Sequence, residues 1–477
     1  MSTAEAKIAD VPKTSVRTFD HWRVLKVAAA VAIPLAVWLA PLPIDRTMHA
    51  AIAISTFLII AWMTELMEYA ATGLLGLMLF WFFDVADESV IFSGFVNDTS
   101  WFYVGAMLIG AMAGKSGLPQ RIGNFVISRI GVTYSRVVLG LIIIDLLLTF
   151  VVPSGTAVLV IMASLALAVM KLFDASKGSN IGRGLFLTLT YVTGIFNKMI
   201  IAGSASIMAR GMIEQAGVTV SYAQWFVAFL PTMLVTVVAA WWFTLKAFPP
   251  EASSLTDRSE QVKAHFRMTE PWTPLSKKAA LLCGLALLLW MTDALHGISP
   301  AIIAFAVGLF ALLPFIDVLD EKDFRSINLL PFFFAASAIG MGEVLETTGA
   351  LRILTDNFIG GLEPWLADRT VAATVLYWGG FLYHFVTASE LSMLATSMPV
   401  LMEFSKSNGL DPLFIGLLWA FATGGKLFAY QSGVLVLGYA YGYFRHTDLI
   451  KIGAFLTVVD FVMVWLSVAF YWPLLGL

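Results

Sequence analysis

The sequence predicts an all-α polytopic membrane protein built from two inverted repeats, and three observations support this. Hydrophobic residues make up 59% of the 477 residues and charged residues only 13%, whereas a soluble chain carries roughly 25% charged residues. Apolar runs long enough to cross a bilayer recur along the chain, with most charged residues gathered between them. The same interruptions by polar residues occur in both halves, in the same order, which is typical of transporters with internal repeats.

Two polar segments divide the chain. Residues 1–23 are rich in Lys and Arg and are expected to be a cytoplasmic N-terminal segment rather than a signal peptide, because no small-residue cleavage site ends the apolar run that follows. Residues 247–278 are also basic and form the expected cytoplasmic linker. They separate a first membrane repeat, 24–246, from a second, 279–477. We therefore expect a multi-pass protein of the inner (plasma) membrane with a cytoplasmic N-terminus.

Each repeat contains one apolar stretch that polar residues interrupt halfway. The stretch near 138–171 breaks at Ser154, Gly155 and Thr156, and the stretch near 372–404 breaks around Ser389 and Glu390. Their arms are short for a full span of about 20 residues. Non-helical backbone at membrane depth is tolerated only where protein or a watery cavity satisfies it. We therefore interpret both stretches as re-entrant helical hairpins. The uninterrupted spans are expected near 24–42, 48–64, 70–84, 101–114, 183–196, 223–246, 279–292, 299–315, 330–345, 412–425 and 451–474.

A broken helix follows each hairpin. The first is expected at about 183–215 and the second at about 412–444. In both, glycine, serine and other polar residues interrupt the apolar run. Lys198 stands at the first break and Lys426 at the second, and a serine follows each lysine at the same spacing. Paired interrupted segments in two halves are the best sequence indication of a transporter binding site.

The four interruptions together predict a site for a small anion. Broken helices expose backbone N–H groups and positive dipole ends, and hydroxyl groups donate to the oxygens of carboxylates or sulfates. Serines can instead bond to the backbone of their own helix, but serines at mirrored breaks favour binding. The candidate substrate-binding residues are Ser154, Gly155, Thr156, Asn197, Ser204, Ser206, Ser389, Glu390, Gln431 and Ser432.

Lys198, Lys426 and Glu390 are the candidate charge-compensating or coupling residues. A charge at the centre of a span costs roughly 2.5–3.5 kcal/mol, so each lysine should face a cavity or a partner. Two structural alternatives stay open: snorkelling of the lysines towards an interface, and an ion pair such as Lys426 with Glu390. Glu390 itself fits either a proton-coupling carboxylate or a permanent lysine partner, depending on whether desolvation or the lysine dominates.

Other chemistries lack support in the sequence. The single cysteine, Cys283, lies in an apolar run, and the six histidines are too scattered for a local metal motif. No nucleophile elbow surrounds the polar tips. A net charge of −3 gives no basic surface for nucleic acid. We therefore expect no enzyme activity, no cofactor and no metal, with a small anionic substrate and the lipid bilayer as partners.

The order of arm helix, hairpin and broken helix, repeated around a cytoplasmic linker, resembles the divalent-anion/sodium symporter family. Local similarities are WMTE at 62–65, TGLL at 72–75 and GAMAGKSGLPQRI at 110–122, and the resemblance covers about residues 20–475. It implies transport of dicarboxylates, citrate or sulfate by a homodimer. It also implies an elevator-type transporter, in which a scaffold, including the spans near 24–84 and 279–315, carries a moving domain with both hairpins and both broken helices.

The sequence departs from the family at its Ser-Asn-Thr tips, which bind substrate and sodium. The first tip here is Ser154, Gly155 and Thr156, and the second has Ser389 followed by Glu390, so both asparagines are absent. Because sodium prefers clustered hard oxygens, we expect sodium-independent exchange or uniport, with Lys198 and Lys426 in place of the two sodium ions. The alternatives are a sodium- or proton-coupled anion symporter that uses Glu390, and an anion channel.

Overall fold

The computed structural model describes residues 21–130, 133–172, 175–251, 271–387 and 389–477, and every regular element in these ranges is helical. The prediction of an all-α fold is therefore confirmed. Six helices or helix pairs are long and apolar enough to cross a membrane: His21–Leu39, Arg46–Met63, Asn180–Gln215, Tyr222–Ala247, Pro274–Met291 and His446–Leu475. Shorter apolar helices lie between them, as hairpin arms and half-helices require.

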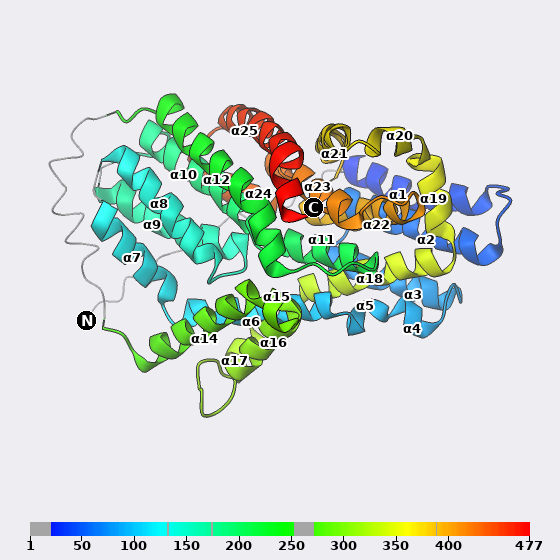
Figure 1. Cartoon of the computed structure of the whole chain (residues 1–477), viewed down its shortest axis with the longest axis horizontal. Helices are drawn as coiled ribbons and strands as arrows, with labels where there is room; N and C mark the ends of the chain where they lie inside the picture. Colours follow the sequence, from blue (N-terminus) through cyan, green and yellow to red (C-terminus); the bar gives the residue numbers. More distant parts are fainter. Residues whose placement is uncertain (1–20, 131–132, 173–174, 252–270, 388) are drawn as a thin grey trace.

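The helices of the first half run from the blue to the green end of Figure 1. They are α1 (His21–Leu39), α2 (Arg46–Met63), α3 (Tyr69–Phe82), α4 (Glu88–Ile91), α5 (Ser93–Val96), α6 (Asp98–Lys115), α7 (Leu118–Ile130), α8 (Tyr134–Thr149), α9 (Gly155–Leu172), α10 (Asn180–Met199), α11 (Ser204–Gln215) and α12 (Tyr222–Ala247).

The helices of the second half begin after the linker. They are α14 (Pro274–Met291), α15 (Asp293–His296), α16 (Pro300–Phe310), α17 (Glu321–Arg325), α18 (Leu330–Thr347), α19 (Ala350–Phe358), α20 (Glu363–Leu366), α21 (Arg369–Tyr383), α22 (Glu390–Ser407), α23 (Pro412–Ala422), α24 (Gly433–Ala440) and α25 (His446–Leu466). Helix α14 begins earlier than the expected span at 279, because Thr273 caps it and Pro274 occupies its first position.

In two places a helix of one half of the chain packs along a helix of the other half. Helix α16 of the second half packs along α6 of the first, and α3 of the first half packs along α18 of the second. Small residues let these helices approach closely, as membrane helices require. A Cβ at Gly73 in α3 would meet the side chain of Ser337 in α18, and a Cβ at Gly105 in α6 would meet the backbone of Phe305 in α16. A Cβ at Gly94 in the short helix α5 would likewise lie 2.6 Å from the carbonyl carbon of Ala336 in α18. The packing of α3 on α18 and of α6 on α16 therefore joins the two halves of the chain.

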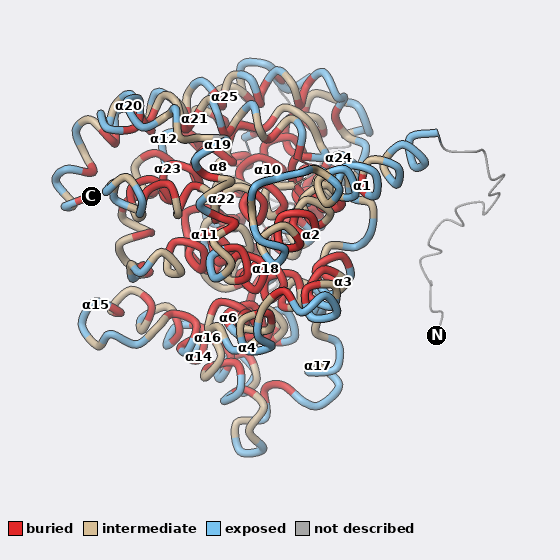
Figure 2. The backbone as a smooth tube through the Cα atoms, turned by 90° about the vertical axis from the view of Figure 1, so that its right-hand side faces the viewer, coloured by how far each residue is buried: buried red, intermediate tan, exposed pale blue. Residues whose placement is uncertain are grey.

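The hairpins and broken helices form a second body of packed helices. Helices α8 and α9 pack as one hairpin and are followed by α10 and α11; α21 and α22 lead to α23 and α24. Helix α10 contacts α9 and α24, and α11 contacts α22 and α23, so the halves interlock. Burial is heaviest here: 89% of the most apolar window in Asn180–Gln215 is buried, against 6% in His21–Leu39 (Figure 2). The helices that carry the breaks are therefore enclosed by protein.

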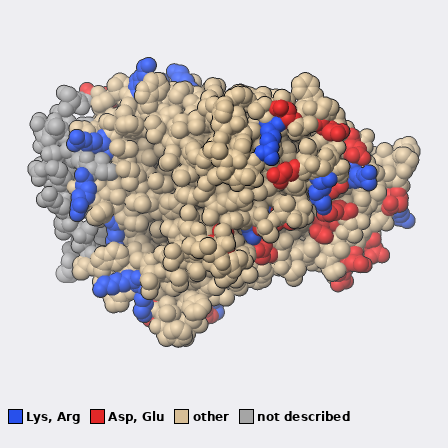
Figure 3. Space-filling view, in the orientation of Figure 1, with Lys and Arg blue, Asp and Glu red and all other residues tan. Residues whose placement is uncertain are grey.

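Charged residues separate towards the two ends of the molecule. Figure 3 shows Lys and Arg with few acidic residues at the end where α7 and α9 finish and α14 begins, whereas the opposite end, beside α3, α18 and α20, shows most of the visible Asp and Glu with several Lys and Arg among them. The basic end carries Arg129, Lys171 and the two adjacent lysines of α14. Between the ends, the visible surface is almost free of charge, as expected for a surface that contacts lipid.

Candidate functional site

Both predicted lysines lie where a helix stops inside the protein. Lys198 is in the last turn of α10, and Lys426 follows the end of α23 before the 3₁₀ turn Ala429–Gln431. Both residues are only 5% exposed. The C-terminal end of a helix carries a partial negative charge that stabilises a cation. The burial excludes snorkelling, because neither ammonium reaches open solvent.

The carboxylate of Glu390 lies between the two lysines. Its Oε1 is 2.7 Å from Nζ of Lys426 and accepts a hydrogen bond of 2.8 Å from the hydroxyl of Ser432. Its Oε2 is 3.8 Å from Nζ of Lys198, which has no hydrogen-bond partner among the described residues. The ion pair of Lys426 with Glu390, which the sequence left open, is therefore present. It is one part of a cluster that joins both halves of the chain.

The second hairpin tip positions Glu390. Ser389 is the N-cap of α22, and its hydroxyl accepts a hydrogen bond of 3.2 Å from the backbone N–H of Ser392. Glu390 is the first residue of the helix, where the positive end of the helix dipole stabilises a carboxylate. Its side chain is 15% exposed, about twice the exposure of either lysine side chain. Glu390 is therefore held by a helix terminus at the edge of the buried cluster.

A second carboxylate, which the sequence analysis missed, belongs to the same cluster. Asp460 of α25 is 5% exposed and accepts a hydrogen bond from the hydroxyl of Thr236 in α12. Its neighbour is Gly424, where a Cβ would lie 3.1 Å from Oδ2 of Asp460 and 3.4 Å from Nζ of Lys198. A glycine at the second break therefore makes room for this carboxylate beside the lysine. The signal was available, because Asp460 is a charged residue in the middle of an apolar span.

The first hairpin tip lies beside the start of α24 and the end of α10. A Cβ at Gly155 would be 3.0 Å from a methyl group of Val434 and 3.3 Å from the side-chain carbonyl carbon of Asn197. The hydroxyls of Ser154 and Thr156 are 3.3 Å apart. The structure thus brings this tip to Asn197, as expected, while the charged cluster gathers around the second tip.

Three other predicted residues form hydrogen bonds at or near the two breaks. The hydroxyl of Ser206 donates to the backbone carbonyl of Lys198 at 3.3 Å, and the backbone carbonyl of Ser204 accepts a hydrogen bond from Tyr103. The carboxamide oxygen of Gln431 accepts from two backbone N–H groups, and its nitrogen donates to the carbonyl of His384 at 3.1 Å. Substrate contact by Gln431 stays a prediction, and the structure gives its side chain a framework role.

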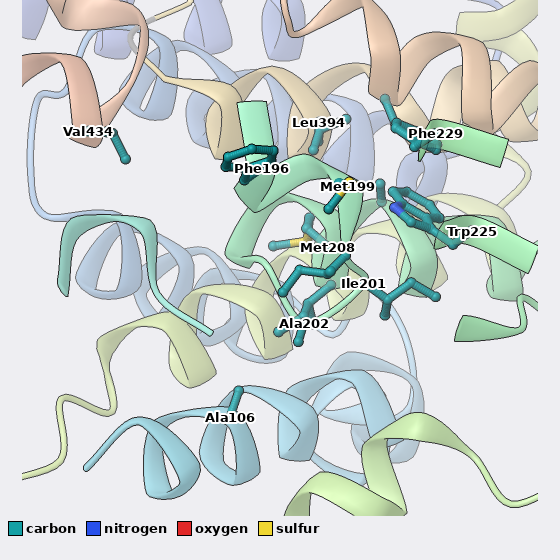
Figure 4. Close-up of a cluster of buried hydrophobic side chains, with 14 of the residues drawn as sticks. Ala106, Phe196, Met199, Ile201, Ala202, Met208, Trp225, Phe229, Leu394 and Val434 are labelled. Atoms are coloured by element: carbon teal, nitrogen blue, oxygen red, sulfur yellow. The ribbon is translucent and has the colours of Figure 1, made fainter. Parts of the chain in front are cut away.

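Aromatic residues of α12 pack against the first break. Trp225 donates from its indole N–H to the carbonyl of Lys198 at 2.9 Å and stacks on Phe229 with the ring centres 4.8 Å apart. Figure 4 shows Trp225 beside Met199, the last residue of α10, and near Ile201 of the break, with Phe229 above Trp225. The unwound carbonyl thus has two donors, since Ser206 also reaches it. The carbonyl at the start of the break is therefore hydrogen-bonded inside the protein, as bilayer depth requires.

The cavity beside the lysines is small. Its volume is about 20 Å³, and Lys198, Lys426, Ser432 and Asp460 are among its lining residues. That is room for about one water molecule, so a dicarboxylate enters only if side chains or helices move. In the part of the chain that the structure describes, no group of three or more His, Cys, Asp or Glu side chains is placed to hold a metal ion. The site therefore offers fixed charges and hydroxyl groups.

Paired hairpins, paired broken helices and enclosed charges define a polytopic helical membrane transporter. The family described as the sodium:sulfate symporter transmembrane region matches residues 21–477, so the chain belongs to that family. The resemblance inferred from the sequence is confirmed.

Relatives over most of the chain are transporters or membrane proteins. The chain is 27% identical to a citrate/succinate antiporter of Escherichia coli (strain K12), over 81% of this chain and 80% of the relative. It is 22% identical to an L-tartrate/succinate antiporter of Escherichia coli (strain UTI89), over 95% of this chain and 98% of the relative. It is 25% identical to a "membrane protein" of Cupriavidus necator, over 96% and 93%.

A solved structure shares the fold. Neisseria gonorrhoeae MtrF, which is described among antimetabolite efflux pumps, matches with a TM-score of 0.54 over 92% of this chain and 98% of its own. The two chains are 12% identical, so this likeness concerns the fold alone.

Proposed function

We propose that the protein is a secondary transporter of small dicarboxylates that works without sodium, by exchange or uniport. The observation that carries this proposal is the position of the two lysines at the breaks: Lys198 lies in the last turn of α10, and Lys426 lies in the non-helical segment that follows the end of α23. In transporters of this architecture, such ends and the unwound carbonyls beside them coordinate the coupling cation. An ammonium in the same electrostatic position supplies a positive charge permanently. The relatives named as antiporters of citrate, tartrate and succinate support a dicarboxylate substrate.

In this proposal, the substrate's carboxylates meet the lysines and the hydroxyl groups of the hairpin tips and breaks. Ser432 already donates to a carboxylate oxygen, that of Glu390, which shows what such a contact looks like. The first tip would bind the other end of the substrate through Ser154 and Thr156. The remaining proposed contacts come from Ser204, Ser206, Ser389, Asn197, Gly155 and Gln431.

A second candidate function is proton-coupled symport. The contact of Glu390 with both lysines favours it, because a substrate carboxylate that takes over the lysines leaves Glu390 without its partners. An unpaired carboxylate in a protein interior gains a proton readily. Proton coupling would then appear as uptake that rises on acidification and loses this dependence in Glu390→Gln.

The test is uptake of labelled succinate, malate, citrate and sulfate into proteoliposomes, with and without sodium, and with and without internal anion. We expect dicarboxylate uptake that ignores sodium and falls strongly in Lys198→Met and Lys426→Met. Lys406→Met is the matched control, because that lysine pairs with Glu346 at the surface. Uptake that requires sodium, or lysine variants that transport normally, would overturn the proposal. Uptake of none of the four anions would remove the substrate class.

We also propose an orientation and an assembly. Positively charged loops remain in the cytoplasm, so the basic end in Figure 3 would be cytoplasmic in the inner membrane, and the basic sequence segments 1–23 and 247–278 would be cytoplasmic for the same reason. The family resemblance implies a homodimer in which the hairpins and broken helices move as an elevator against the arms. A cysteine introduced in the linker, labelled by an impermeant thiol reagent in broken but not intact cells, would support this orientation.

A further inference from the structure

We propose that Asp460 determines substrate specificity: its Oδ2 accepts a hydrogen bond from a hydroxyl group on the carbon next to the substrate carboxylate that Lys198 binds. The preferred substrate class is then a chiral 2-hydroxydicarboxylate rather than an unsubstituted dicarboxylate such as succinate. The inference rests on the proposed function and names the substrate class of the same site.

Lys198 carries the ammonium group that is open to a substrate. Its Nζ has no hydrogen-bond partner among the described residues, and Oε2 of Glu390, at 3.8 Å, lies beyond hydrogen-bond distance. Nζ of Lys426, by contrast, is 2.7 Å from Oε1 of Glu390. Both lysines line the cavity of about 20 Å³. Because a buried donor without a partner is costly, a substrate carboxylate that enters this cavity would pair with Lys198.

Asp460 places an acceptor beside that ammonium. Thr236 of α12 donates to Oδ1 of Asp460, whereas Oδ2 lies on the side of Gly424. A Cβ at Gly424 would be 3.1 Å from Oδ2 and 3.4 Å from Nζ of Lys198, so the two atoms border the same small space. Asp460 also lines the cavity. An ionised carboxylate only accepts hydrogen bonds, so a ligand group that faces Oδ2 should be a donor.

A hydroxyl next to a carboxylate matches this pair of groups. The carboxylate accepts from the ammonium of Lys198, and the hydroxyl on the adjacent carbon donates to Oδ2 of Asp460. An ammonium in the same place, as in an amino dicarboxylate, would stand close to the positive charges of Lys198 and Lys426. A methylene, as in succinate, would leave a buried acceptor without a partner. Of these three substituents, the cavity therefore favours the hydroxyl.

Three contacts make such a site chiral. In the proposed function, one substrate carboxylate pairs with Lys198 and the other reaches the first hairpin tip, so the substrate is held at both ends. Only one enantiomer of a 2-hydroxydicarboxylate then directs its hydroxyl at Asp460. A hydrogen bond to a charged group corresponds to about 10- to 100-fold in affinity. We expect discrimination of this size between two enantiomers, which have the same charge and the same size.

The experiment measures how L-malate, D-malate, succinate and aspartate inhibit the uptake of labelled succinate into proteoliposomes of the full chain. We expect one malate enantiomer to inhibit the wild type at least about tenfold more strongly than each of the other three compounds. Asp460→Ala should bring the two enantiomers to within about twofold of each other, because it removes the acceptor. Asp460→Asn keeps the shape of the side chain and should give an intermediate ratio, because hydrogen bonds to neutral acceptors are weaker.

Asp448→Asn is the matched control. Asp448 lies in the first turn of the same helix α25 and pairs with Arg183 at 2.6 Å, outside the residues that line the cavity. Its replacement removes a buried carboxylate of the same helix and should leave the ratio between the enantiomers unchanged. The ratio does not depend on the amount of folded protein, and if Asp460→Ala does not fold, Asp460→Asn carries the comparison.

Four outcomes overturn the inference. The first is a wild type that does not distinguish the malate enantiomers. The second is a ratio that survives in the Asp460 variants, even where uptake as a whole falls, since Asp460 would then act on folding or on all substrates alike. The third is an equal loss of the ratio in Asp448→Asn, and the fourth is stronger inhibition by aspartate than by either malate.

The proposed function fails by a different result. Absence of succinate uptake in the wild type overturns both the proposed function and the inference. Uptake that requires sodium overturns only the sodium-free mode, because the ratio between the malate enantiomers still tests Asp460.

Discussion

Replacement of Lys426 by methionine tests how much the buried ion pair of Lys426 with Glu390 contributes to stability. The substitution keeps most of the apolar stem but removes the ammonium 2.7 Å from Glu390, so that only Lys198, at 3.8 Å, remains near that carboxylate. With an effective dielectric constant near 20, the gross attraction is about 6 kcal/mol at the shorter distance and about 4 kcal/mol at the longer one. Desolvation offsets much of it, but the loss of one partner of a buried pair costs about 3–5 kcal/mol.

The surface pair of Lys406 with Glu346 is a matched control. Its atoms are 2.8 Å apart, almost the same distance, but the side chains are 37% and 43% exposed. Exposed pairs contribute about 0–1 kcal/mol. We therefore expect Lys426→Met to lower the apparent melting temperature in detergent several times more than Lys406→Met does. The measurement is intrinsic tryptophan fluorescence during heating.

A double variant separates the pair from the individual residues. Lys426→Met with Glu390→Gln removes both charges, so we expect it to recover about 1–3 kcal/mol of the loss seen in Lys426→Met. If Lys426→Met and Lys406→Met shift the melting temperature equally, or the double variant is as unstable as the sum of the single ones, the cluster is not held by a buried ion pair. The reasoning on the site would then be wrong.

Other predictions concern the packing around the site. Arg210→Gln should destabilise the protein by about 3 kcal/mol in a heating assay, because this 2%-exposed guanidinium pairs with two carboxylates, whereas Asp98→Asn at its 38%-exposed partner should cost under about 1 kcal/mol. Thr236→Val removes the hydroxyl donor of the buried carboxylate on α25, and should lower stability by about 1–3 kcal/mol and slow succinate counterflow. Gly94→Ala places a Cβ against the backbone of α18 and should lower the yield of folded protein by size-exclusion chromatography, whereas Gly114→Ala, which has open space, should be neutral or stabilising.

The architecture could be predicted because hydropathy is a local property. Helices that face lipid must be apolar over about 20 residues, and backbone that leaves the helix must be surrounded by polar or small residues. The tips at Ser154 and Ser389 and the breaks at Lys198 and Lys426 therefore left a mark in the sequence itself. The packing of α16 on α6 and of α3 on α18 has no such local signal in the sequence, because it depends on contacts between segments that are distant along the chain.

The site could be predicted only in part, for a related reason. Lys198, Lys426 and Glu390 stand at interruptions of the apolar pattern, so the pattern points to them. Asp460 stands inside an uninterrupted run, and its relation to Lys198 arises only when α25 packs beside the second break. The framework role of Gln431 also needs the folded backbone, because its hydrogen-bond partners belong to the break and to the end of α21.

A lysine and a sodium ion differ in one respect that explains the carboxylates in this cluster. A sodium ion leaves with the substrate, so an empty site loses its positive charge and can return across the membrane. A lysine stays, and two of them would leave the empty site doubly charged, at roughly a 100-fold penalty for each charge. On the proposed function, a protein with this substitution either carries an anion in both directions or supplies counter-ions of its own. Glu390 lies between the two lysines at the start of α22, so a substrate carboxylate would have to displace Glu390 to reach both ammonium groups.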